Sequence, residues 1–345
     1  MTKLVFVTQQ VDPRHPALAA TVPKIRALAE LVDEVVVLAD GAVEGVLPEN
    51  CRVRTFRAGV KALRGARFET ALARELPGLR GGGAVVAHMC PIYAVLAAPL
   101  VRPAGVPLVL WFTHWRSSRL LQLAERVSTA VTTVDERSFP LPSQKLHAIG
   151  HGIDLDEFPC SAPRDGDGMR LLALGRYSTA KGLDVVVAAV PLAGPKVTLD
   201  VYGPSLSDEE GAHRLELEQL VGELGLEERV TIGDPVPRAD IPALLQSHDA
   251  LVNNMRAGAP DKVVYEAAAS CLPVLASNPI FDELLDPAQR FPRFDARALA
   301  ERIQNVAALG TGERAALGRR LRERVGDGHS VQSWARGILD AAGLS

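Results

Sequence analysis

The sequence predicts an α/β protein with two Rossmann-like, doubly wound parallel-sheet domains, and three observations support this. Short runs rich in valine, leucine and isoleucine alternate with segments of helical spacing, which is typical of parallel sheets covered by helices. The length of 345 residues is enough for two domains of ordinary size, each with its own core. Residues 161–168, SAPRDGDG, have the composition of a linker. We therefore expect domains over 1–160 and 169–325, with a terminal helix over 326–345.

The first half of the chain supplies the strands of the first predicted domain. Helical spacing separates several of them, notably over 17–31 and 68–79. His88 and His114 come at the ends of two strands, and ligand crevices lie at the carboxyl ends of strands in such sheets. A single histidine can equally be a structural group of the core, and for His88 both interpretations stay open. The predicted strands are 4–8, 35–38, 52–55, 84–88, 107–112, 130–134 and 145–149.

The second predicted domain begins with a strand over 169–174 that leads into GRYSTAKG at 175–182. Arg176 can hold phosphate oxygens in a fork, and Lys181 can add a mobile positive charge. The helix that follows directs its positive end to the same place. The alternative is an ordinary surface turn. Further strands are expected over 197–203, 229–233, 250–252 and 273–276, and further helices over 208–224, 241–247, 262–270, 281–285, 296–325 and 329–342.

Residues 249–277, DALVNNMRAGAPDKVVYEAAASCLPVLAS, have the pattern of strand, loop, helix and strand. A loop that enters a helix at the carboxyl end of a parallel strand is an anion site. Asp261 lies at the helix start, where its carboxylate can cap free backbone N–H groups. Glu266 lies one turn further among apolar residues and needs a partner there. A ribose diol can be that partner, and so can Lys262, four residues earlier.

Four segments resemble the retaining glycosyltransferases of family 4, which have the GT-B fold, and one of them is Thr113-His114 at the end of a strand. EAAASCLPV at 266–274 is similar to the family motif EAxAxGxPV, GRYSTAKG to its GR…KG loop, and HGIDLDEF at 151–158 to its nGvD…F segment. The family carries a second glutamate eight positions before Glu266, where this chain has Gly258. In GT-B enzymes a terminal helix crosses back onto the first domain.

The resemblance implies a hexosyltransferase that moves a sugar from a UDP- or GDP-sugar to a hydroxyl acceptor, such as a glycan, a lipid-linked sugar or a small molecule. Arg176 and Lys181 would hold the diphosphate and, with His114 beside the sugar, form the catalytic set. The mechanism implied is front-face displacement without metal or cofactor, because cationic side chains replace a metal in this fold. The expected donor-binding residues are Arg176, Lys181, Val236 (beside the base), Gly258, Asp261, Lys262 and Glu266 (on the ribose).

Composition excludes some other classes of protein. Lys plus Arg is 38 against Asp plus Glu at 41, which argues against a nucleic-acid binder. No apolar run has the length of a membrane span and the N-terminus has no signal-peptide pattern, so a cytoplasmic protein is expected, with peripheral membrane association left open. Four scattered cysteines are expected to be free thiols. A sugar-nucleotide epimerase or hydrolase, or a non-catalytic binding protein suggested by Gly258, stays open as an alternative.

Overall fold

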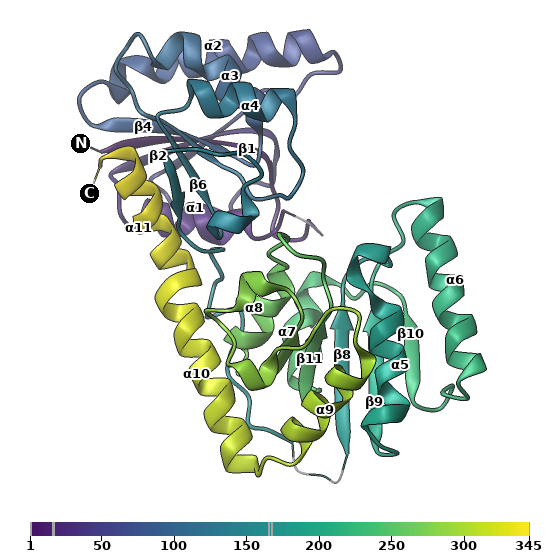
Figure 1. Ribbon diagram of the computed structural model, residues 1–345. Coiled ribbons are helices and arrows are strands. Elements are labelled where there is room, and N and C mark those ends of the chain that lie inside the picture. Colours follow the sequence, from purple (N-terminus) through teal and green to yellow (C-terminus); the bar gives the residue numbers. More distant parts are fainter. Residues whose placement is uncertain (1, 16–17, 165, 167, 345) are drawn as a thin grey trace. The chain divides into compact units, whose positions relative to one another are not determined.

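The computed structural model describes residues 2–15, 18–164, 166 and 168–344 of the chain. It divides into two compact units (Figure 1). The first contains the chain up to Asp154 and again from Gly328, and the second runs from Leu155 to Asp327. Residue 17 of the helix predicted over 17–31, and residues 165 and 167 of the predicted linker, lie outside the described residues.

The first unit is built on a seven-stranded sheet in the order β3-β2-β1-β4-β5-β6-β7. All its strand pairs are parallel, as the alternation of strands and helices predicts. Helices α2, α3 and α4 cover one face, and α1 and α11 pack together on the other (Figure 1). The elements are β1 (Lys3–Val11), α1 (Thr21–Ala29), β2 (Glu34–Ala42), β3 (Cys51–Thr55), α2 (Lys61–Leu79), β4 (Gly83–His88), α3 (Pro91–Val101), β5 (Leu108–Trp111), α4 (Arg119–Val127), β6 (Ala130–Thr133), η1 (Glu136–Ser138), β7 (Leu146–Ala148) and α11 (Val331–Ala342).

The second unit is built on a five-stranded parallel sheet in the order β10-β9-β8-β11-β12. Helix α5 packs beside α6 and α9, and α8 lies against β11 and β12. The elements are β8 (Met169–Leu174), η2 (Thr179–Lys181), α5 (Leu183–Ala193), β9 (Val197–Tyr202), α6 (Asp208–Glu223), β10 (Val230–Gly233), η3 (Arg238–Asp240), α7 (Ile241–Gln246), β11 (Ala250–Asn253), α8 (Lys262–Ala269), β12 (Val274–Ala276), η4 (Pro279–Phe281), η5 (Pro287–Gln289), α9 (Ala296–Ala307) and α10 (Thr311–His329).

The strand order of the second sheet reverses between β8 and β11. From β8 the chain adds β9 and β10 on one side, and then returns to add β11 and β12 on the other. The loops that follow β8 and β11 therefore diverge at the carboxyl edge of the sheet, which is where ligands bind in open α/β sheets. The loop after β8 contains the motif GRYSTAKG, and the loop after β11 leads into α8, where the motif EAAASCLPV begins.

The C-terminal helices correct one expectation about helix length. The helix predicted over 296–325 is broken into α9 and α10 at residues 308–310, where the Gly310 amide is capped by the Glu313 side chain at 2.9 Å. Arg314 of α10 is buried, with 7% of its surface exposed. Arg322 donates to the backbone carbonyls of Leu155 and Phe158. These arginines are part of the packed interior of the unit, and the spacing of apolar residues in the sequence does not show this.

The entry to the second unit corrects the prediction that all four cysteines are free. Cys160 and Cys271 form a disulfide, with their Cα atoms 5.0 Å apart, while Cys51 and Cys90 are free thiols. Because residues 155–160 run along the C-terminal end of α8, two cysteines separated by 111 positions meet. The second unit begins at Leu155, before the predicted linker.

The chain returns to the first unit at Gly328, and α11 packs its fully buried Trp334 against Phe6 and Trp111. Among the helices of the described residues, none combines the length and apolar character that crossing a bilayer requires.

Candidate functional site

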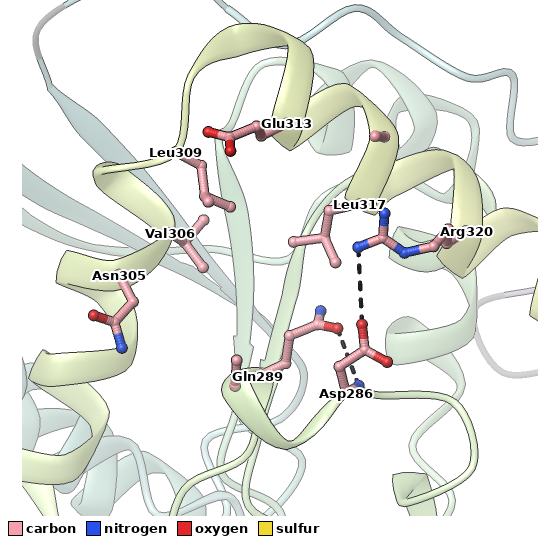
Figure 2. Close-up of a pocket in the computed structure, with 10 residues that line it drawn as sticks. Asp286, Gln289, Asn305, Val306, Leu309, Glu313, Leu317 and Arg320 are labelled. Atoms are coloured by element: carbon pink, nitrogen blue, oxygen red, sulfur yellow. Dashed lines mark hydrogen bonds and ion pairs between the residues drawn. The ribbon is translucent and has the colours of Figure 1, made fainter.

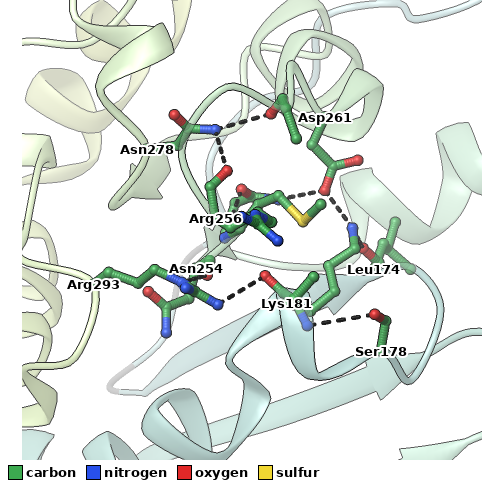
Figure 3. Close-up of polar contacts among 12 residues, drawn as sticks. Leu174, Ser178, Lys181, Asn254, Arg256, Asp261, Asn278 and Arg293 are labelled. Carbon is green, nitrogen blue, oxygen red and sulfur yellow. Dashed lines mark hydrogen bonds and ion pairs between the residues drawn. The ribbon is translucent and has the colours of Figure 1, made fainter. Parts of the chain in front are cut away.

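The loop after β8 places the Lys181 ammonium group at the carboxyl edge of the second sheet. Lys181 Nζ donates to the backbone carbonyl of Leu174 at 3.1 Å and pairs with the Asp261 carboxylate (Figure 3). Gly175 has φ of +132°, and a Cβ built on it would clash with Lys181 Nζ. The glycine of the GR…KG motif therefore leaves the space that the lysine side chain occupies.

Asp261 starts α8 as predicted, but it does not cap the helix. Its side chain accepts no hydrogen bond from the helix backbone. Its Oδ2 instead accepts from Lys181 Nζ and from Asn253 Nδ2, the latter at 2.7 Å. The expected cap is therefore wrong, because the carboxylate is drawn to a nearby positive charge that forms a stronger bond than a backbone amide.

Arg256 and Arg293 add positive charge beside this loop, and the sequence analysis did not single out either. Arg293 donates to the backbone carbonyls of Ala180 at 3.1 Å and Asn254 at 3.3 Å (Figure 3). Burial and the charge of Arg256 lower the pKa of Arg293. Two arginines held close enough to repel each other favour an anion at this edge. Arg293 follows β12 by many residues and carries no motif, so only the fold reveals it.

Glu266 is the buried carboxylate of the site, with 3% of its surface exposed. Its Oε1 accepts from Arg238 Nη1 at 2.6 Å and from Lys262 Nζ at 2.9 Å. Burial acts to raise the pKa of Glu266, but the charges of Lys262 and Arg238 outweigh it and hold that pKa below its usual value. The carboxylate is therefore ionised, and the pairing with Lys262 that the sequence left open is present.

Arg238 is a site residue that the sequence analysis missed. It lies in η3, two residues after Val236, and its side chain is 11% exposed. Its second nitrogen, Nη2, donates to Glu157 Oε2 at 3.0 Å, and the guanidinium lies 5.0 Å from the ring centre of Phe158. No periodicity or motif marks this arginine, because both its carboxylate partners are distant in sequence.

Arg176 does not join Lys181 in this structure. It pairs with Glu210 of α6 at 3.0 Å, and its side chain is 55% exposed.

Val236 is half-buried in the loop that leads to Arg238. Gly258 is half-buried in the loop between β11 and α8 with φ of +79°, a conformation that glycine adopts readily and a glutamate does not. The structure thus groups Lys181 with Asp261, and Glu266 with Lys262.

The two histidines of the first unit have different environments. His114 is exposed, and its Nδ1 accepts from the Arg116 amide at 3.0 Å while its ring stacks on Trp115. His88 is buried and stacks on Trp111 with ring centres 4.8 Å apart. Burial lowers the pKa of His88 well below its usual value, so it is a neutral residue of the core. This agrees with the structural interpretation of His88.

The hollow between η5, α9 and α10 contains none of the predicted site residues. Its volume is about 360 Å³, and it is walled by Val306, Leu309 and Leu317 with Asp286 and Arg320 at its edge (Figure 2). Arg320 lies 3.8 Å from Asp286 across it, which ties η5 to α10. Among the residues that the structure describes, no three His, Cys, Asp or Glu side chains are grouped so that they could hold a metal ion.

Comparison with known proteins assigns the second unit to a family. Residues 156–324 match the family model described as glycosyl transferases group 1. This segment is a member of that family. The match includes both loops at the carboxyl edge of the second sheet, with Lys181, Asp261 and Glu266.

A curated relative and several solved structures are similar to this chain. Mannosylfructose-phosphate synthase of Agrobacterium fabrum is 28% identical over 153 residues, which are 40% of this chain and 34% of that protein. The match therefore spans about a third of the relative's length.

Solved structures match over the whole chain at low identity. Anabaena Alr3699/HepE in complex with UDP has a TM-score of 0.77 at 19% identity, with 100% of both chains covered. Sucrose-phosphate synthase of Thermosynechococcus elongatus has a TM-score of 0.73 at 17% identity, over 99% of this chain and 98% of that one. These likenesses confirm the predicted fold class, two Rossmann-like α/β units of the GT-B type.

Proposed function

We propose that this protein is a retaining hexosyltransferase that moves a sugar from a nucleoside-diphosphate sugar to a hydroxyl acceptor. One observation carries the proposal. At the switch point of the second sheet, inside the segment of the group 1 family, Lys181 and the buried, ionised Glu266 lie on the loop after β8 and on helix α8. Such an edge offers positive charge to a diphosphate and a carboxylate to a ribose.

The donor would be held mainly by the second unit. Lys181 takes the diphosphate, and Asp261 keeps its ammonium group in place before the donor binds. Arg176, whose side chain is 55% exposed, joins it by exchanging its ion pair with Glu210 for a phosphate oxygen. Glu266 accepts a ribose hydroxyl, and Val236 lies beside the base. A UDP-sugar is the first donor to test, since similar structures are complexes with UDP and with UDP-glucose.

The chemistry we infer is front-face displacement without a metal. The bond from the sugar C1 to the phosphate oxygen breaks while the acceptor oxygen bonds to C1 on the same face. The acceptor proton passes to the leaving phosphate. Lys181 and Arg176 stabilise the charge that develops on the leaving oxygens, and His114 of the first unit approaches the sugar. A glycan, a lipid-linked sugar or a small molecule is the acceptor.

A non-catalytic sugar-nucleotide binding protein is the second candidate. Gly258 occupies the position of the family's other glutamate, and its φ of +79° suits glycine. A side chain that contacts the transferred sugar is therefore missing at this position. An epimerase or hydrolase of the same fold is the third alternative, and it would act on the donor without an acceptor.

One experiment separates these functions. The protein is incubated with UDP-glucose, GDP-mannose or ADP-glucose, with and without a mixture of sugar and lipid-linked acceptors. Release of nucleoside diphosphate only when an acceptor is present supports transfer. An epimerised donor, or release without an acceptor, supports the epimerase or hydrolase. Binding without turnover supports the binding protein. If none of the three donors binds, all three candidate functions are contradicted for these nucleotide sugars.

A further inference from the structure

The two carboxylate oxygens of Glu266 have different surroundings. Oε1 accepts two charged donors, Arg238 Nη1 at 2.6 Å and Lys262 Nζ at 2.9 Å. No described residue donates to Oε2. A carboxylate that is fixed through one oxygen presents the other in a defined direction. The free Oε2 is therefore the atom of Glu266 that is available to a ligand.

The two cations that hold Oε1 are not equivalent. Lys262 ends in a point charge on a flexible stem, and its side chain is 26% exposed. Arg238 has a planar fork, is 11% exposed and lies against the ring of Phe158. A rigid fork with one nitrogen on each of two carboxylates defines a geometry that a lysine cannot define. Arg238 is therefore the residue that fixes the orientation of the Glu266 carboxylate.

Arg238 is itself held from a separate segment of the chain. Glu157 Oε2 accepts from Arg238 Nη2 at 3.0 Å. The backbone around Glu157 is fastened on both sides, because Arg322 donates to the carbonyls of Leu155 and Phe158, and Cys160 is bonded to Cys271. Glu157 thus provides a fixed point for the second nitrogen of the fork.

We propose that Arg238 is a positioning residue for donor binding: it directs Oε2 of Glu266 at the ribose of the nucleotide, and Glu157 holds Arg238 in the required orientation. This inference rests on the proposed function, since the ribose is the ligand group that Glu266 would accept there. Arg238 need not contact the nucleotide. Arg238 affects nucleotide affinity through Glu266. Its contribution to that affinity should therefore depend on the ribose hydroxyls.

The first test compares UDP with 2′,3′-dideoxyuridine diphosphate by calorimetry. Arg238→Met keeps an unbranched apolar side chain and removes the fork, and it should weaken UDP binding about tenfold, as the loss of a well-oriented charge-assisted bond does. Arg238→Lys and Glu157→Gln should weaken it less. None of the three should change the affinity for the dideoxy nucleotide, whose sugar offers Glu266 no hydroxyl pair. Equal losses for both nucleotides would show a general structural effect and overturn the proposal.

The chain offers a matched control in Arg214. Its guanidinium also lies between two carboxylates, Glu218 at 3.1 Å and Asp234 at 2.7 Å, and it lies 5.3 Å from the ring centre of Tyr177. Arg214→Met removes the same kind of interaction at a distance from Glu266. It should leave the affinity for both nucleotides unchanged, and a loss equal to that of Arg238→Met would contradict a specific role for Arg238.

The second test needs no nucleotide. The side-chain carboxyl signal of Glu266, assigned by its absence from Glu266→Gln, is titrated by NMR in the wild type, in Arg238→Met and in Arg214→Met. The pKa of Glu266 should rise in Arg238→Met alone, and an unchanged pKa there overturns the proposal. If the wild type binds neither UDP nor GDP, the proposed function fails, while this titration still decides whether Arg238 controls Glu266.

Discussion

Replacing Gly175 by alanine should weaken donor binding by displacing Lys181. A Cβ at position 175 would lie 2.6 Å from Lys181 Cε and closer still to Nζ, so the side chain has to move by about 1 Å to restore an ordinary contact. That shift breaks the 3.1 Å bond from Nζ to the Leu174 carbonyl. A bond to a charged group is worth about 1.5 to 3 kcal/mol, so UDP affinity should fall by about 10- to 100-fold.

Alanine also strains the backbone here, and Gly194 controls for that effect. The φ of Gly175 is +132° and that of Gly194 is +129°, but nothing lies within 4 Å of a Cβ at Gly194. Both substitutions should lower the free energy of unfolding by about 1 to 3 kcal/mol, measured by urea denaturation. Only Gly175→Ala should lose affinity for UDP, measured by calorimetry. Equal UDP affinity in the two variants would show that the position of Lys181 does not matter for the donor.

Four further predictions concern the mechanism and the stability of the chain. Arg176→Ala should lower turnover at least about tenfold with little change in the urea midpoint, and normal turnover would remove Arg176 from the mechanism. Burial lowers the pKa of His329 from 6.5 to about 4, so below pH 6.5 the unfolded state takes up a proton that the folded state does not. The free energy of unfolding should therefore fall by about 3 kcal/mol between pH 6.5 and 4, and His329→Gln should lack this part of the pH dependence in urea titrations at each pH. Cys160→Ser should cost about 3 to 5 kcal/mol because the disulfide to Cys271 closes a long loop, whereas Cys51→Ser should cost much less; a wild type in dithiothreitol that stays as stable as in its absence would contradict the bond. Dialysis against EDTA should leave turnover unchanged, and a loss that Mg²⁺ restores would contradict metal-independent transfer.

The interactions that hold the site were beyond sequence analysis for one shared reason. Glu157, Arg238 and Glu266 come from three separate segments, and Lys181 and Arg293 from two more. Motifs mark Lys181 and Glu266 themselves, but no period or spacing in the sequence marks Arg238 and Arg293 or shows which residues pair with one another. Charged side chains choose partners by proximity in space, so the expected cap by Asp261 gave way to its pairing with Lys181, and the free thiol expected at Cys271 is a disulfide.

The sequence by itself determined the fold class, the strands of both sheets and the two loops at the edge of the second sheet. These follow from local patterns, because runs of β-branched and aliphatic residues can be buried only as strands or helices of matching period. Only the tertiary structure decided which oxygen of Glu266 stays free, that Arg176 lies against Glu210, and that Arg238 belongs to the site. These depend on distances of a few ångströms between segments remote in the chain, and such distances are set by how helices pack on the sheets.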